Sequence, residues 1–347
     1  MQPLSKHPER ERAIWQATSR FSFEQAIARS HAAATAIYDN FEVNSLLADL
    51  GLVRPNIAVA IDRLVTEDLI RDNQQGGFDI TNLMVLAAAK DMRSFGGFNR
   101  KGVRVITYSG KTKLNSKSDA EGKKGYAVSF QALLSYVMTR IPHREQMLHG
   151  KRVTIYDIPE IAVREILANA IIHQDFTATG DGPVVEIFPD KLRVTNPGNP
   201  LIAIDRFIDS PSRSRNEKFG HLMRRVGICE ERGSGVDRAL YEIESVALPA
   251  PLFQQIEDST VVTIFGPKPF ANMTKEDRVR ACYQHACLGF EKNEYMSNSS
   301  LRKRLGLSDK QYPQISIVIA EAREAGVIRP LDEDQANRNA RYVPYWA

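Results

Sequence analysis

A helix that carries a polar stripe within an apolar sequence is the feature that most constrains this chain. Within residues 159–176, PEIAVREILANAIIHQDF, the residues Glu165, Asn169 and His173 are spaced four apart. Such residues lie about 40° apart around a helix and share one face. The opposite face is apolar and can pack on a sheet: Val163, Leu167 and Ala170. The helix is therefore predicted to line a cleft, with simple solvent exposure of the stripe as the alternative.

The residue types of this stripe fit magnesium and phosphate chemistry. The carboxamide oxygen of Asn169 is a hard ligand of the kind that Mg²⁺ prefers. Glu165, one turn earlier, can orient a water molecule toward a phosphate and remove its proton.

A broken strand lies downstream of this helix. Leu192 and Val194 alternate with polar residues, as in a half-buried strand, and the pattern ends at Asn196-Pro197-Gly198. A glycine lets the backbone approach a flat ligand closely, and the Asn196 side chain can hydrogen-bond the edge of a base. An ordinary turn is the alternative.

A glycine-rich loop comes next, before the helix VDRALYEIESV. Glycines at a helix N-terminus expose amide N–H groups to an anion, which predicts a phosphate site here. The loop residues are Arg232, Gly233, Ser234 and Gly235. The polar segment before them is predicted to be a lid that reaches phosphates through Arg213, Arg215 and Asn216. A tight loop and a solvated face are the alternatives.

Composition fits a globular protein of two or three domains. The 347 residues are 43% hydrophobic and 25% charged, and the net charge of +4 permits nucleic-acid contact without requiring it. No apolar run approaches the ~18 residues that span a bilayer, and the N-terminus lacks a signal-peptide core. We therefore expect a cytoplasmic protein without membrane contact. Free thiols are expected at Cys229, Cys282 and Cys287.

Four units are expected, at residues 1–78, 79–150, 151–267 and 268–347. In the first unit, residues 8–35 are predicted to be helical. Residues 43–70 predict a helix, a turn and a second helix, and a Gly-Gly pair before a short strand predicts a wing. The unit resembles a small winged helix, with a helical subdomain that only packs as the alternative.

The second unit is predicted to be mixed α/β, with helices from ITNLMVLAAAKDM and YAVSFQALLSYVMTRI, the strand VRVITYSG and the charged loop SDAEGKKG. Gly110-Lys111-Thr112 imitates the end of a phosphate-binding P-loop. That motif needs a glycine where Val105 stands, and it needs a helix directly afterwards, whereas this sequence continues as a loop. A helicase motor is therefore not expected.

The last unit follows a proline-containing linker at residues 266–272. Its predicted order is helix, short helix, turn, longer helix and extended tail, which is typical of a winged helix-turn-helix. The candidate DNA-contacting residues are Arg302, Lys303, Arg304, Lys310, Gln311 and Tyr312. Acidic residues such as Glu321 and Glu324 leave dimerisation open as the alternative role.

The order of the central motifs is similar to that of the gyrase, Hsp90, histidine-kinase and MutL (GHKL) superfamily of ATPases. More narrowly, REILANAIIHQDF, EIFPDKLRVTNPG and SRNEKFGHLMRRVGICEERGSG resemble bacterial RecG-related proteins over roughly residues 79–267. The resemblance implies an α+β multidomain fold, with a GHKL (Bergerat-type) α/β sandwich flanked by helical and winged-helix units. Many such proteins also carry an AlbA-type (Schlafen-like) domain. No such module is found upstream of residue 79, so a shortened relative or a fragment is expected.

The resemblance also implies ATP and Mg²⁺ as ligands, with Glu165 as general base, Asn169 as Mg²⁺ ligand and His173 in the nucleotide site. Asn196 stands where the superfamily usually has the Asp that reads the adenine amino group. Gly198 would be the turn glycine, and Gly233 and Gly235 the phosphate-loop glycines. Pro200 replaces a second turn glycine and is expected to narrow the adenine pocket.

The leading functional hypothesis is a regulator that binds, and slowly hydrolyses, ATP·Mg²⁺ and couples its nucleotide state to DNA binding by the terminal units. A homodimer is expected. The alternative is a DNA-binding transcriptional regulator or dimerisation module whose GHKL-like domain is a scaffold that binds no nucleotide.

Overall fold

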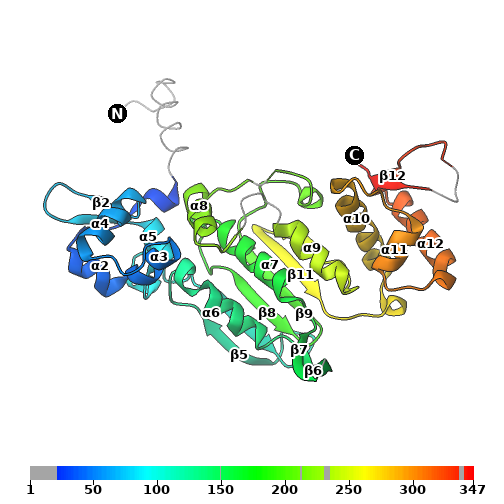
Figure 1. The fold of residues 1–347 in the computed structure, drawn as a ribbon, viewed down its shortest axis with the longest axis horizontal. Coiled ribbons are helices and arrows are strands. Elements are labelled where there is room, and N and C mark those ends of the chain that lie inside the picture. Colours follow the sequence, from blue (N-terminus) through cyan, green and yellow to red (C-terminus); the bar gives the residue numbers. More distant parts are fainter. Residues whose placement is uncertain (1–21, 149, 212, 230–234, 336–339) are drawn as a thin grey trace.

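The computed structural model describes residues 22–148, 150–211, 213–229, 235–335 and 340–347. Three parts follow one another along the longest axis of the molecule: an N-terminal unit, a central sheet with its helices, and a C-terminal unit (Figure 1).

The N-terminal unit, residues 22–81, combines short helices with a three-stranded sheet of order β1-β3-β2. The helix, turn and helix predicted within residues 43–70 are confirmed as α3 and α4, and Asn56 caps α4 by accepting from the Val59 amide. The helix predicted for residues 8–35 is wrong at residues 27–32, which form β1 because they pair with β3. The elements are η2 (Phe23–Gln25), β1 (Ile27–Ala32), α2 (Ala34–Asn40), α3 (Val43–Asp49), α4 (Ile57–Thr66), β2 (Ile70–Asp72) and β3 (Phe78–Thr81).

The central part contains a six-stranded mixed sheet of order β10-β11-β9-β8-β4-β5, in which β4 and β8 are parallel and the other neighbours antiparallel. Helices α6, α7 and α9 lie across one face of this sheet (Figure 1). The strands are β4 (Arg104–Tyr108), β5 (Ser116–Glu121), β8 (Val184–Phe188), β9 (Lys191–Pro197), β10 (Leu252–Ile256) and β11 (Ser259–Phe265). The helices are α5 (Asn82–Ala88), η3 (Met92–Ser94), α6 (Tyr126–Met138), α7 (Glu160–Ile172), η4 (Ile204–Arg206), α8 (Glu217–Arg225) and α9 (Gly235–Ser245). A separate two-stranded hairpin joins α6 to α7: β6 (His143–Leu148) and β7 (Lys151–Tyr156).

Part of the predicted charged loop after β4 is a strand. Residues 118–121 belong to β5, and Arg104 of β4 holds Asp119 at 2.6 Å across the strand pair. No helix follows Gly110 directly, so the rejection of a P-loop is confirmed.

The C-terminal unit has the predicted order of elements: helices first, then a two-stranded antiparallel sheet. They are η5 (Phe270–Asn272), α10 (Lys275–Glu291), α11 (Asn298–Arg304), η6 (Asp309–Gln311), α12 (Tyr312–Glu324), β12 (Ile328–Pro330) and β13 (Tyr342–Pro344).

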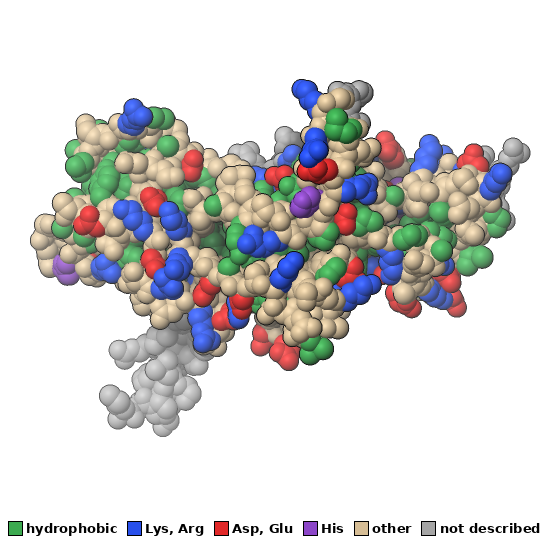
Figure 2. All heavy atoms as spheres, turned by 90° about the horizontal axis from the view of Figure 1, so that it is seen from below, with side chains coloured by type: hydrophobic (Ala, Val, Ile, Leu, Met, Phe, Trp, Pro, Cys, Tyr) green, Lys and Arg blue, Asp and Glu red, His purple; other side chains and the backbone are tan. Residues whose placement is uncertain are grey.

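The hydrophobic cores divide the molecule unequally. One continuous cluster of buried side chains runs from Ala32 to Ile264 and so joins the N-terminal unit to the central sheet. The C-terminal unit has a core of its own, built around Cys282, Leu301 and Val318. Among the described residues, no helix is both long and apolar enough to cross a membrane. Basic and acidic side chains are interspersed on the face drawn in Figure 2.

Candidate functional site

The polar stripe of α7 faces inward. Glu165 is only 2% exposed, although it is a carboxylate on a helix. Glu165, Asn169 and His173 all line one cavity of about 970 Å³, which lies within the usual range for small-molecule sites. The alternative that the stripe simply faces solvent is therefore excluded for Glu165.

Two arginines lie beside Glu165. The Arg164 Nη1 atom is 2.9 Å from Oε1, and the Arg238 Nη1 atom is 3.9 Å from the same oxygen. Arg164 also donates to the carbonyl of Gly227 at 2.7 Å. These contacts hold the carboxylate at the edge of the cavity, where a second, smaller cavity begins.

The first residue of α9 lies directly against the stripe. A Cβ atom added to Gly235 would stand 2.9 Å from Glu165 Oε2 and 3.3 Å from Asn169 Nδ2. A side chain at this position would displace the Glu165 carboxylate and crowd the Asn169 amide, the two groups that the sequence assigned to catalysis and metal binding. The close approach brings the N-terminus of an eleven-residue helix to the cavity, where its dipole favours an anion.

Asn169 has a buried polar atom that needs a partner. Its Nδ2 atom forms no hydrogen bond among the described residues. A buried amide without partners costs free energy, so this side chain is suited to meet a ligand. The described residues contain no group of three or more His, Cys, Asp or Glu side chains that could enclose a metal. One asparagine oxygen fits Mg²⁺ when phosphate and water oxygens supply the remaining ligands.

The end of β9 forms another wall. Asn196 is 6% exposed and lines the cavity, on the same face of the strand as Leu192 and Val194. In the antiparallel register, Asn196 pairs with Thr260 of β11, whose hydroxyl donates to the Gly198 carbonyl at 2.9 Å. Thr260 also lines the cavity, and sequence reasoning missed it.

Gly198 fits only without a side chain. Its φ is +109°, and an added Cβ would lie 2.4 Å from Arg215 Nη1 and 2.9 Å from Asp175 Cβ. The turn is thus packed against the segment that follows α7. Pro200 lies in the cavity wall, and about 970 Å³ of space remains beside it.

The predicted lid residues divide into two groups. Arg213 and Arg215 line the cavity, and Arg215 donates to the carbonyls of His173 at 3.1 Å and Asn199 at 2.7 Å. Asn216 is buried and donates to the carbonyls of Ile172 and Gln174, so it closes the C-terminal end of α7. Its role in this structure is to position α7.

The surroundings of His173 favour the neutral form of its imidazole. Burial lowers the pKa of its imidazole, and the charge of Arg215 lowers that pKa further, while a hydrogen bond with the Arg213 backbone opposes both effects. A neutral imidazole at the C-terminal end of the stripe adds no positive charge to the cavity.

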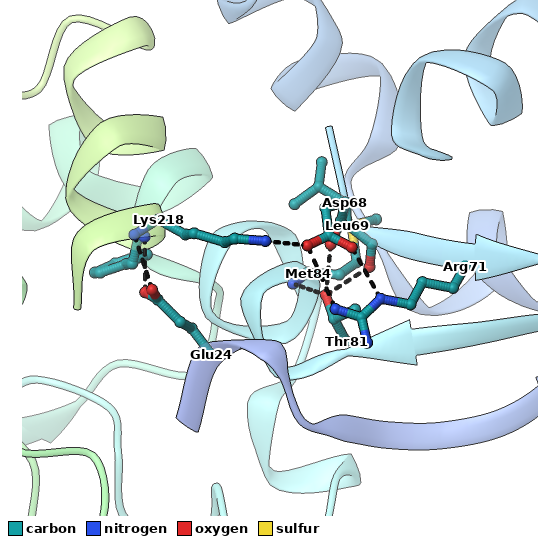
Figure 3. A network of polar contacts seen from close by, with 8 residues as sticks. Glu24, Asp68, Leu69, Arg71, Thr81, Met84 and Lys218 are labelled. Carbon is teal, nitrogen blue, oxygen red and sulfur yellow. Dashed lines mark hydrogen bonds and ion pairs between the residues drawn. The ribbon is translucent and has the colours of Figure 1, made fainter. Parts of the chain in front are cut away.

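Helix α8 connects the cavity to the N-terminal unit. Glu217, Gly220 and Arg224 line the cavity. At the start of the same helix, the carboxylate of Glu24, which is 1% exposed, accepts from the amides of Lys218 at 2.8 Å and Phe219 at 2.7 Å (Figure 3). The Lys218 ammonium pairs with Asp68, which also holds Arg71 (Figure 3).

Three predicted loop residues, Arg232, Gly233 and Ser234, lie outside the described residues. The structure therefore places only Gly235 of that predicted phosphate loop.

The candidate DNA contacts are split between surface and interior. Arg302 is buried against Asp309 at 2.6 Å, and Arg304, 6% exposed, lies 3.4 Å from Glu244 of α9. Neither guanidinium is presented to solvent as a phosphate contact requires. Lys303, Lys310 and Tyr312 are exposed and Gln311 is partly exposed.

Comparisons with known proteins agree with the central part of this site. Residues 180–264 match the family described as "Putative ATP-dependent DNA helicase recG C-terminal". The match includes Asn196, Gly198 and Thr260, and it begins after α7. It supports an HATPase_c-like ATP-binding domain related to the RecG C-terminal region, within a mixed α+β protein.

A crystal structure of the DIP2311 protein from Corynebacterium diphtheriae is similar, with 17% identity and a TM-score of 0.57. The alignment covers 96% of this chain and 67% of that one, and at this identity the likeness concerns the fold alone. No curated protein matches the chain.

Proposed function

We propose that this protein binds ATP·Mg²⁺ in the cavity between α7, α8, α9 and the end of β9, and that it acts as a regulator. One observation carries the proposal: Glu165, Asn169, Asn196 and Gly235, which come from three separate segments, line the same cavity. Chance burial of polar residues does not predict that convergence, because each buried polar group without a partner is costly.

Different residues along the cavity would bind the base, bind Mg²⁺ and activate water. Asn196 lies at the end of β9 and Thr260 at the start of β11, where a base would be read. Asn169 would hold Mg²⁺, which neutralises phosphate charge when bound. Glu165 would accept the proton of an attacking water, which makes slow hydrolysis the expected reaction.

The terminal units are connected to the cavity through two helices. Helix α8 lines the cavity and is capped by Glu24 of the N-terminal unit. Helix α9 begins at the cavity, and its Glu244 contacts His285 of α10 and Arg304 of α11. A ligand that shifted either helix would therefore act on a terminal unit, which supports a regulatory role.

Thermal unfolding with ATP and MgCl₂ tests the proposal. A ligand at a hundred times its Kd stabilises the native state by about 2.7 kcal/mol, so the Tm should rise by several degrees. Asn169→Ala should remove the magnesium-dependent part of the rise, and Glu165→Gln should keep binding but abolish phosphate release. Glu160→Ala, on the exposed first turn of α7, is the matched control. No shift at millimolar ATP would favour the scaffold alternative.

We further propose that DNA binding, if the C-terminal unit performs it, uses the exposed Lys303, Lys310 and Tyr312 rather than the buried arginines. Affinity should then fall with added salt, because phosphate contacts release counterions. Light scattering at several concentrations tests the proposed homodimer.

A further inference from the structure

No hydrogen bond within the described part of the chain holds the carboxamide of Asn196 in one orientation. The side chain is buried at the end of β9 and borders the cavity, yet it forms no hydrogen bond with any part of the chain that the structure describes. Because the side chain lines the cavity, its amide oxygen and NH₂ group are available to a ligand.

The polar groups of Thr260 and Arg215 near Asn196 donate their hydrogen bonds to backbone carbonyls. The Thr260 hydroxyl gives its proton to the Gly198 carbonyl, so that proton cannot hold the Asn196 oxygen. Arg215 directs Nη1 to the carbonyl of His173 and Nη2 to that of Asn199. The amide can therefore present either its oxygen or its NH₂ group to the cavity.

This freedom changes which base the site can accept. A carboxylate at this position only accepts hydrogen bonds, so it selects a 6-amino group and repels a 6-oxo group. A primary amide accepts from a 6-amino group through its oxygen, and after rotation by about 180° it donates to a 6-oxo group through its nitrogen.

We infer that Asn196 allows the cavity to bind 6-oxopurine nucleotides as well as 6-aminopurine nucleotides, so that GTP and ITP compete with ATP. The inference rests on the proposed function, since it concerns the base end of the same cavity. The apolar side chains of Leu201, Phe253 and Val262 also line the cavity and suit the flat face of either purine.

Calorimetric titration with ATP, ITP, GTP and UTP, each with MgCl₂, tests this inference. ITP carries the 6-oxo group without the 2-amino group of GTP, so the ATP and ITP comparison isolates the 6-position. Wild-type protein should bind ATP and ITP with Kd values within about threefold of each other, and UTP at least tenfold more weakly. Asn196→Asp should keep ATP affinity and weaken ITP and GTP by about ten- to hundredfold, because a buried acceptor would face another acceptor.

Each outcome is decisive. Wild-type protein that binds ATP more than about threefold tighter than ITP overturns the inference while the proposed function stands. Equal binding of UTP also overturns it, since the base would then not be read. Failure of all four nucleotides to bind overturns the proposed function and the inference together. The wild-type comparison of ATP with ITP holds even if the Asn196→Asp substitution prevents folding.

Discussion

The two terminal units are attached to the central sheet in different ways. At the N-terminal interface, where residues 22–81 meet the central part, the hydrophobic core continues without interruption, and charged pairs surround it. Phe23 of the N-terminal unit stacks on Phe176, which packs against Phe219 of α8, while Arg225 on the same helix pairs with Glu67.

At the C-terminal interface, where residues 268–347 meet α9 and η4, the shared apolar cluster is small: Ile208, Leu240, Cys287 and Leu288. Hydrogen bonds, ion pairs and a cation–π contact make up much of the rest of this interface. Glu244 meets His285 and Arg304, the Tyr345 hydroxyl bonds to Asp205, and Arg206 lies 4.6 Å from the Trp346 ring.

The difference indicates which unit can move. Separating the N-terminal unit would expose continuous apolar surface, at about 25 cal/mol for each Å². The C-terminal unit keeps its own core when it separates. We therefore expect nucleotide-dependent rearrangement to occur mainly at the C-terminal interface.

Truncation of Phe219 should give the largest effect. Phe219→Ala removes a fully buried ring from the shared core and should lower the free energy of unfolding by about 3–5 kcal/mol. Urea denaturation followed by peptide-resolved hydrogen–deuterium exchange should show the N-terminal and central parts unfolding together. Phe219→Leu is the control and should cost much less. Separate unfolding transitions for these two parts would contradict a shared hydrophobic core at the N-terminal interface.

Removal of the Glu24 carboxylate should give the next largest effect. Glu24→Ala leaves the part-buried amide of Lys218 and the buried amide of Phe219 without an acceptor and should cost about 2–3 kcal/mol. Glu24→Gln retains an acceptor oxygen and should cost about half as much. Denaturant titration measures both, and a loss below about 0.5 kcal/mol for Glu24→Ala would contradict the assigned capping role.

Substitution of Asp237 at the C-terminal interface should give the smallest change in stability, and that change should depend on pH. Burial, and then the charges of Glu291 and Asp209, raise the pKa of Asp237 at the C-terminal interface to about 7. Because this folded-state pKa exceeds the unfolded value, stability from the protonated form is lost as pH rises through about 7. Asp237→Asn should therefore stabilise the protein at pH 8 by about 1–2 kcal/mol, discounted for partial exposure, and much less at pH 5.

The N-terminal interface should respond in the opposite direction. A hydrogen bond from Arg225 lowers the pKa of Glu67. Burial alone would raise the pKa of Asp68, but hydrogen bonds from Arg71 and Lys218 outweigh it and lower that pKa. These groups stabilise the fold above their unfolded pKa values and lose that contribution only as pH falls into the acid range. Equal pH responses at both interfaces, measured by unfolding between pH 4 and pH 9, would contradict this contrast.

Local sequence patterns predicted some residues of the candidate site. Other residues are brought there by contacts between segments that are far apart in the sequence, and these could not be predicted. The spacing of Glu165 and Asn169 on one helix predicted the inward stripe, because helical periodicity is a local property. Thr260 reaches Asn196 only through the register of β9 and β11, which no short motif encodes. Glu24 lies in a stretch that was predicted to be helical, and its partners are on α8.

The basic residues of α11 show a second reason why the sequence alone could not predict the site. A run of Arg302, Lys303 and Arg304 is typical of a solvated, nucleic-acid-binding face. Two of the three instead meet carboxylates, one within the unit and one on α9. Burial of a charged group depends on a partner brought by the tertiary fold, so charge pattern alone could not predict it.

The Glu24 cap also has a consequence in time. The carboxylate and the Lys218 amide are separated by 194 positions in the chain. At 5–20 residues per second, a ribosome needs on the order of 10–40 s between the two. During that interval a carboxylate destined for burial stays hydrated, and the nascent N-terminal unit exposes the apolar surface that α8 later covers. The nascent chain should therefore be most prone to aggregation and to chaperone capture until α8 has been synthesised.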